Sequence, residues 1–152
     1  MRIIVAIAVI TALLVNLRGN IVISSPMITD FTDNSIDYFY ANFGEISYGK
    51  TLTLDLLLFN DSFCDTSLEF EHLQKPTYIV IRATTIQGCS YTKRTLFAQS
   101  IGAKGIIIAT DISLSQKGNV IHADDGNGKK VHISCFFITP ATFDKLRSLS
   151  KV

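Results

Sequence analysis

Two β-branched runs, separated by a segment with helical spacing, constrain this fold more than any other part of the chain. The runs cover residues 78–81 and 106–108. Between them, small and apolar side chains recur every three or four residues, which is typical of one face of a helix. This face consists of Tyr91, Thr95, Ala98 and Gly102, with Leu96 and Ile101 at its edges.

The segment between the runs also carries the signals of a helix start and a helix end. The hydroxyl oxygen of Ser90 can accept a backbone N–H bond in the first turn, and Gly102-Ala103 can end the helix. We therefore expect strand, helix and strand in succession, joined by a right-handed crossover. The pattern predicts a single domain of the α/β (α+β mixed) class.

Shorter patterns predict the remaining elements. Strands are expected over residues 36–43, 52–59, 120–123 and 132–138. A helical turn is expected over residues 68–74, and a hairpin turn at residues 124–130, DDGNGKK. Thr139 and Pro140 predict the start of a final helix that runs to Leu149.

Residues 1–19 are predicted to be a secretory signal peptide. Arg2 supplies a positive charge, and residues 3–15 form an apolar run shorter than the roughly 20 residues that a membrane-spanning helix needs. A buried strand and an uncleaved anchor are the alternatives. Residues 20–35 are expected to form an edge strand or an irregular lead-in to a domain at residues 36–152. We expect no membrane insertion of the mature domain.

Composition argues against two classes of partner. The chain is 47% apolar and 18% charged, which is typical of a folded protein. Its net charge is +1, and without the two arginines of residues 1–19 it is −1. Because no basic excess is present, we expect neither nucleic acid nor an anionic membrane surface as a partner.

Cys89 is a candidate catalytic thiol. It lies at the predicted N-terminus of a helix, and this position lowers the pKa of a thiol. A cysteine hydrolase also needs a histidine base, and His72, His122 and His132 are available in principle. The sequence signatures that surround such nucleophiles are absent, and an oxidised cysteine cannot attack a substrate. We therefore expect no catalytic residue.

The candidate ligands of a metal site are His122, Asp124, Asp125 and His132. Turn chemistry explains the Asp-Asp-Gly-Asn-Gly stretch without a metal, and the stretch lacks the length and the final glutamate of a calcium-binding EF-hand loop. No glycine-rich phosphate loop is present either. We therefore expect neither a metal nor a cofactor.

Three blocks of the sequence resemble the protease-associated (PA) domain family. Residues 88–110 are similar to the central motif, in which a glycine-cysteine pair opens a helix before an apolar strand. Residues 41–52 and 60–65 resemble the segment before that motif in vacuolar sorting receptors, and residues 124–146 resemble the closing strand and helix. The resemblance covers about residues 36–150. It implies a PA-like open β-barrel or sandwich flanked by short helices.

The three cysteines are expected to divide into one bonded pair and one buried thiol. Cys64 lies in a polar loop and Cys89 in a turn, whereas Cys135 lies in an apolar strand pattern. Many PA domains bridge the first two positions, so the resemblance implies a Cys64–Cys89 disulfide. That bond would close a loop of about 25 residues and add about 3 kcal/mol of stability.

PA domains are generally non-catalytic modules that bind peptides or position substrates. The resemblance therefore implies a protein- or peptide-binding module of the secretory pathway, either extracellular or in a vacuolar or endosomal lumen. By position, the cargo-contacting turn of the receptors corresponds to residues 86–91, and residues 111–130 would form a second loop of the binding surface. The candidate ligand-binding residues are Ile86, Gln87, Gly88, Ser90 and Tyr91.

One position departs from the receptors. They carry an arginine three residues before the second cysteine, where this chain has Ile86. The fixed positive charge that could meet a ligand carboxylate is therefore missing at this position.

Two alternative functions stay open, and one modification is predicted. The chain could be a truncated fragment of a larger PA-containing sorting receptor, protease or transmembrane ubiquitin ligase, or a small thiol- or metal-dependent hydrolase. Asn60 begins the triplet Asn60-Asp61-Ser62, which predicts a glycosylated, exposed loop in a secreted protein.

Overall fold

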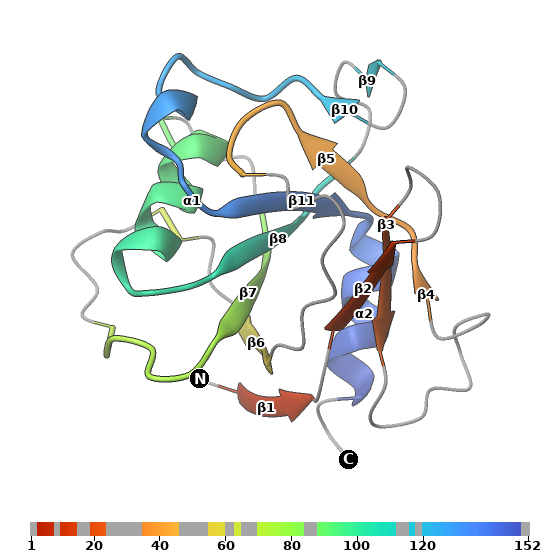
Figure 1. The fold of residues 1–152 in the computed structure, drawn as a ribbon. Helices are drawn as coiled ribbons and strands as arrows, with labels where there is room; N and C mark the ends of the chain where they lie inside the picture. The colour runs from red at the N-terminus through yellow and green to blue at the C-terminus, as the bar shows by residue number, and fades with distance from the viewer. Residues whose placement is uncertain are drawn as a thin grey trace.

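The computed structural model describes ten segments of the chain. They are residues 3–7, 10–14, 19–23, 35–45, 55–59, 63–64, 70–83, 88–111, 116–117 and 120–149. In chain order (Figure 1), their elements are β1 (Ile3–Ile7), β2 (Ile10–Leu14), β3 (Gly19–Ile23), β4 (Ser35–Ile36), β5 (Phe39–Ala41), β6 (Asp55–Phe59), β7 (Thr77–Arg82), α1 (Tyr91–Ser100), β8 (Gly105–Ala109), β9 (Gln116–Lys117), β10 (Val120–Ile121), the 3-10 helix η2 (Gly128–Lys130), β11 (Ser134–Ile138) and α2 (Pro140–Leu149).

These elements form a mixed α/β fold, as predicted. The main sheet has the strand order β1-β6-β7-β8-β11-β5-β10-β9, and a second, antiparallel sheet has the order β2-β3-β4. Strands β6, β7, β8 and β11 are mutually parallel, and β5 pairs antiparallel with β11. The parallel pair β7–β8 with α1 between them in sequence is the strand-helix-strand unit that the sequence predicted.

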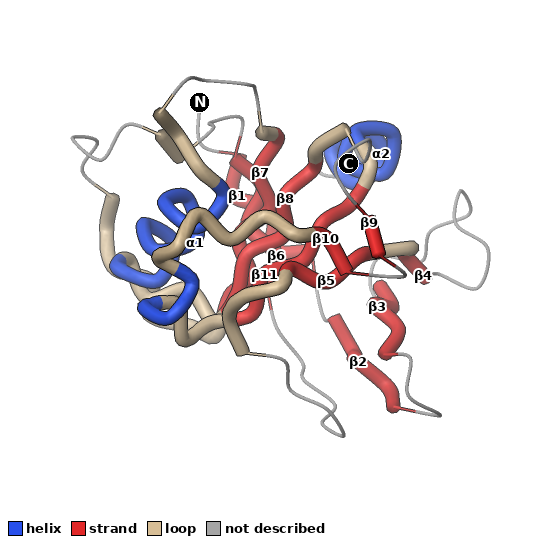
Figure 2. Tube along the Cα trace, turned by 90° about the horizontal axis from the view of Figure 1, so that it is seen from above, coloured by secondary structure: helices blue, strands red, loops and turns tan. Residues whose placement is uncertain are grey.

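The central strands are buried on both faces, which explains their continuous β-branched runs. Alternate residues point to opposite sides of the sheet, and α1 and α2 cover opposite sides (Figure 2). On the α1 side the two strands contribute Ile79, Ile81, Ile106 and Ile108 to the core, and on the α2 side they contribute Tyr78, Val80, Ile107 and Ala109.

Helix α1 begins and ends at the predicted residues. The backbone N–H of Lys93 donates to Ser90 Oγ at 3.1 Å, so Ser90 is the N-cap. After the helix, Gly102 adopts φ +89°, and a β-carbon there would lie 2.5 Å from the ring of His72. A residue with a side chain therefore fits neither this backbone conformation nor this contact.

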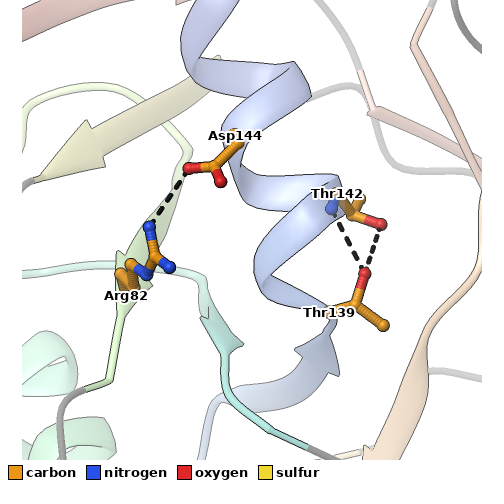
Figure 3. Close-up of polar contacts among 4 residues, drawn as sticks. All are labelled: Arg82, Thr139, Thr142 and Asp144. Carbon is orange, nitrogen blue, oxygen red and sulfur yellow. Dashed lines mark hydrogen bonds and ion pairs between the residues drawn. The ribbon is translucent and has the colours of Figure 1, made fainter.

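Helix α2 also follows the prediction. The backbone N–H of Thr142 donates to Thr139 Oγ1 at 3.2 Å, which caps the first turn (Figure 3). Phe143 and Leu146 are buried against the sheet. On the exposed side of the helix, Asp144 accepts a hydrogen bond from Arg82 at 3.2 Å, which joins α2 to the end of β7 (Figure 3).

Two turn predictions are wrong. Residues 70–74, the described part of the predicted helical turn, are irregular, because the Leu73 N–H donates to the Ile101 carbonyl at 2.8 Å instead of to a local carbonyl. Residues 124–130 do not form a hairpin, because β5 lies between β10 and β11 in the sheet. The loop closes on Asp124, whose Oδ1 accepts from the N–H groups of Gly126 and Gly128 at 2.9 and 2.8 Å.

Several predicted strands are shorter than expected. The strand predicted over residues 36–43 is interrupted after β4 and continues as β5, and β10 ends at Ile121. Strand β10 stops there because the next N–H groups, of Ala123 and Asp124, donate to the side chain of Asn42 and not to a neighbouring strand. Strand β11 begins at Ser134.

The N-terminal segment forms strands in this structure. Strand β1 pairs antiparallel with β6, and β2 pairs with β3. The signal peptide at residues 1–19, the lead-in and the domain boundary stay predictions, and residues 24–34 of the lead-in lie outside the described segments. In the part of the chain that the structure describes, no helix has the length and apolar character to cross a membrane.

The packing predicts that burial, and not surface ion pairing, dominates stability. Replacing Ile79, which is 0% exposed, with alanine should lower the free energy of unfolding by about 2–5 kcal/mol, because it leaves a cavity in the core. Arg82→Ala, which removes an ion pair whose side chains are 44% and 50% exposed, should cost less than about 1 kcal/mol. Urea denaturation of both variants measures the difference, and equal losses would contradict this ranking.

Candidate functional site

Cys64 and Cys89 form a disulfide, as predicted. The S–S distance is 2.09 Å and the Cα atoms are 5.5 Å apart. Both residues are half-buried, and Cys89 lies directly before the N-cap of α1. The bond therefore fixes the segment around Cys64 to the start of this helix. Cys135 is the free, buried cysteine that the sequence predicted.

An aromatic cluster holds the residue beside the disulfide. Phe63 is 0% exposed, and its ring centroid lies 5.2–5.4 Å from those of Phe59, Phe70 and Phe97. Its φ is +57°, a left-handed conformation that costs a non-glycine residue about 1–3 kcal/mol. Burial of the ring offsets this cost and thereby fixes the backbone conformation of Phe63, the residue before Cys64.

Arg94 lies on the buried side of the corner that the disulfide and the start of α1 form. Its side chain is 2% exposed, its Nε donates to Cys89 Sγ at 3.2 Å, and its guanidinium lies 5.6 Å from the Tyr91 ring centroid. Burial lowers the pKa of Arg94, and the Tyr91 side chain acts in the opposite direction. Sequence reasoning missed this residue. The available signal was its place beside Thr95, on the helix face predicted to be buried.

Ser90 joins the turn before α1 to the loop after β10. Its hydroxyl donates to Asp125 Oδ2 at 2.6 Å while its oxygen accepts from the Lys93 N–H. The Asn127 N–H donates to Asp125 Oδ1 at 3.0 Å. Hydrogen bonds from the side chains of Ser90 and then Thr92, followed by those from Asn127, hold the pKa of Asp125 well below its usual range. Asp125 therefore presents a fixed negative charge beside the disulfide at neutral pH.

A hollow of about 630 Å³ opens at this corner. Its floor and walls combine the turn before α1, the first turns of the helix and the loop after β10. The lining residues are Gly88, Cys89, Ser90, Lys93, Leu96, Asp125 and Asn127. The hollow thus offers one cationic side chain, one anionic side chain and one apolar wall, a combination suited to a peptide-like ligand.

The structure brings some of the predicted ligand-binding residues together. Gly88 and Ser90 line the hollow, whereas Tyr91 does not: its OH bonds to Thr110 Oγ1 at 2.8 Å and its ring packs on Phe137. Ile86, Gln87 and the predicted glycosylation site Asn60 lie outside the described residues. Asp125 and Asn127 lie in the loop 111–130 that was predicted as the second part of the binding surface. Lys93 and Leu96 were not predicted, because their proximity to that loop depends on how α1 meets it.

The residues of the thiol hypothesis do not come together. Of the described residues that line the hollow with Cys89, none is a histidine. The His72 ring packs against the position of Gly102, and the backbone N–H of His132 donates to Gln99 Oε1 at 2.6 Å; both contacts lie at the end of α1 opposite Cys89. A hydrolase triad needs an imidazole within hydrogen-bond reach of the thiol.

The two aspartates of the metal hypothesis have other roles. Asp124 accepts two backbone hydrogen bonds within its own loop, and Asp125 accepts from Ser90. Among the described residues, no group of three or more His, Cys, Asp and Glu side chains is arranged to hold a metal ion.

Comparisons with known proteins identify no relative. No protein-family model matches the sequence, and the curated proteins include no match to it.

The cysteine arrangement predicts one slowly reacting thiol in the native protein. Burial raises the pKa of Cys135 to about 12, so its thiol stays protonated and enclosed at neutral pH. Alkylation without reductant should modify no cysteine quickly in native protein and only Cys135 after denaturation. Mass mapping identifies the modified residue. Rapid modification of Cys89 in the unreduced protein would contradict the disulfide.

The Ser90–Asp125 bond predicts a pH-dependent contribution to stability. Because the pKa of Asp125 is lowered on folding, its carboxylate stabilises the native state fully above the ordinary aspartate pKa of about 3.9. This contribution is lost as the pH falls through the lower, folded-state value. Native protein should therefore be more stable than Asp125→Asn at about pH 6, and the difference should shrink below about pH 4.

Urea denaturation across this pH range measures the effect. Ser90→Ala, which leaves the carboxylate in place but removes its main hydrogen bond, should weaken the same pH dependence. A native–variant difference that stays constant from neutral to acidic pH would contradict this account.

Proposed function

We propose that this chain is a non-catalytic protein- or peptide-binding module of the secretory pathway, of the PA type. The ligand lies in the hollow beside the Cys64–Cys89 disulfide. The PA-like open barrel or sandwich is part of the same proposal, which rests on the sequence blocks that resemble the family.

One observation carries the proposal: the 2.6 Å bond from Ser90 to Asp125. The sequence assigned the binding surface to a turn and a separate loop, and Ser90 and Asp125, one from each, are 35 residues apart. That bond brings the described parts of both segments to one hollow, which Gly88 and Ser90 line from one side and Asp125 and Asn127 from the other.

The surroundings of the hollow suit binding better than catalysis. The disulfide and the Phe63 cluster fix one wall, and the N-cap fixes another. Binding to a preformed surface costs less conformational entropy than binding to one that must first become ordered. Lys93 and Leu96 add a cationic head and an apolar surface, which together can contact a peptide side chain and its backbone carbonyls.

A disulfide is typical of an oxidising, secretory compartment. Within that class, we place the protein in the extracellular space or in a vacuolar or endosomal lumen, where the PA-bearing sorting receptors act. The glycosylation triplet at Asn60 agrees with this placement.

A peptide selection on the purified protein tests the function. We expect phage-displayed random peptides to yield ligands with a Kd of about micromolar, measured by calorimetry with synthetic peptides. Lys93→Glu and Leu96→Gln, which change the charge and the apolar wall of the hollow, should each weaken binding at least about tenfold.

Lys145→Glu is the matched control, because Lys145 is exposed on α2, on the other side of the sheet. It should leave the affinity unchanged. Failure to select any peptide, or equal loss of affinity in all three variants, would overturn the proposal.

A further inference from the structure

The sulfur of Cys89 lies in a strongly electropositive environment. Arg94 Nε donates to it at 3.2 Å, and Arg94 Nη2 also donates to the Cys89 carbonyl oxygen at 3.5 Å. Cys89 directly precedes Ser90, the N-cap of a ten-residue helix, where unpaired N–H groups carry partial positive charge. Two independent features therefore favour negative charge on this sulfur.

Burial strengthens the effect of the guanidinium. The Arg94 side chain is 2% exposed, so water and salt screen it little. An arginine stays protonated at neutral pH even where burial lowers its pKa. On breaking of the disulfide, the electron pair left on Cys89 Sγ would meet a fixed positive charge already in contact with it.

The other described charges around the hollow change this picture little. Lys93 adds a second cation on the exposed side of the helix, and Asp125 contributes an anion. Asp125 keeps its negative charge and opposes a thiolate on Cys89, but its oxygens bond to Ser90 and Asn127, whereas Arg94 Nε donates to the sulfur itself. The net field at Cys89 therefore favours a thiolate.

A thiol in solution can reach the bond. Cys64, the sulfur that the thiolate attacks, is half-buried and not enclosed. Cys89, the leaving sulfur, lines the open hollow of about 630 Å³. Structural disulfides that resist reduction are shielded and have poor leaving groups. This disulfide has neither protection.

We propose that the Cys64–Cys89 disulfide is a thiol-exchange site for small thiols of the glutathione class, with Cys89 as the leaving sulfur held by Arg94. The thiolate of the small thiol attacks Cys64 Sγ, the S–S bond breaks, and its electron pair goes to Cys89 Sγ. A second small thiolate then attacks the sulfur of the small thiol that is bound to Cys64. The mixed disulfide breaks, and Cys64 leaves as a thiolate, which takes a proton from water. The protein gains two electrons and the two small thiols become one disulfide.

This exchange does not depend on the proposed peptide binding. Its readouts are thiol counts and the site of the mixed disulfide, measured without any peptide. Failure of the peptide selection would leave these readouts unchanged, and failure of the exchange would leave the peptide affinities unchanged.

The position of the mixed disulfide is the first test and needs no variant. Native protein treated with limiting glutathione is quenched in acid and mapped by mass spectrometry. We expect glutathione on Cys64. Glutathione mainly on Cys89, or no reduction of the native protein before it unfolds, would overturn the proposal. Cys135 reports on folding in the same samples, because it stays unmodified while the core is intact.

The contribution of Arg94 is the second test. In glutathione buffers of fixed composition, the equilibrium constant for reduction should fall about tenfold in Arg94→Met, which keeps side-chain bulk but removes the charge. Arg94→Lys should fall less. Lys145→Met is the control, since it removes an exposed cation from α2, on the other side of the sheet, and its constant should stay close to that of the native protein.

The pH dependence of alkylation completes the test. In fully reduced protein, the rate at Cys89 should reach half its maximum about one pH unit or more below the value for free cysteine, and Arg94→Met should remove this difference. Identical equilibrium constants and identical alkylation profiles in native protein and Arg94→Met would overturn the role of Arg94.

Discussion

Burial of β7 and β8 on both faces is the constraint on which the rest of the structure depends. Their parallel register, with Ile79 opposite Ile106 and Ile81 opposite Ile108, removes a continuous apolar ribbon from water. Parallel neighbours cannot be joined by a tight turn, so the chain must return over one face of the sheet, and α1 makes that return. The start of α1 is thereby fixed at the edge of the core, where the disulfide and the hollow lie.

The corner at this helix start is held by interactions that differ in kind. The disulfide is covalent, Ser90 supplies a neutral cap, Asp125 supplies a hydrogen-bonded charge, and Arg94 supplies a buried one. A buried guanidinium adds little net stability, because loss of its hydration offsets much of the gain. Its position against Cys89 is therefore better explained by the charge that it presents to the sulfur than by its contribution to folding.

The sequence predicts those features whose causes are local. The β-branched runs, the Ser90 and Thr139 caps and the buried Cys135 depend on a few neighbouring residues, and the structure has all of them. The Cys64–Cys89 pair came from the family resemblance. The turn at residues 124–130 failed as a prediction because β5 lies between β10 and β11, and because Asn42, 81 positions before Ala123, accepts the N–H of that residue. For the same reason Lys93 and Leu96 could not be assigned to a site before their partners across the hollow were placed.

The proposed ligand binding and the proposed disulfide exchange are compatible because the hydrogen bonds that shape the hollow do not involve the disulfide sulfurs. The helix start depends on Ser90 Oγ and on the Thr95 hydroxyl, which donates to the Tyr91 carbonyl at 2.8 Å; neither bond involves a sulfur. The Ser90–Asp125 bond that shapes the hollow is equally independent of Cys64. Reduction would therefore free the segment around Cys64 and leave α1 and the opposite wall in place. Phe63, packed among three other aromatic rings, limits how far Cys64 can move from the start of α1.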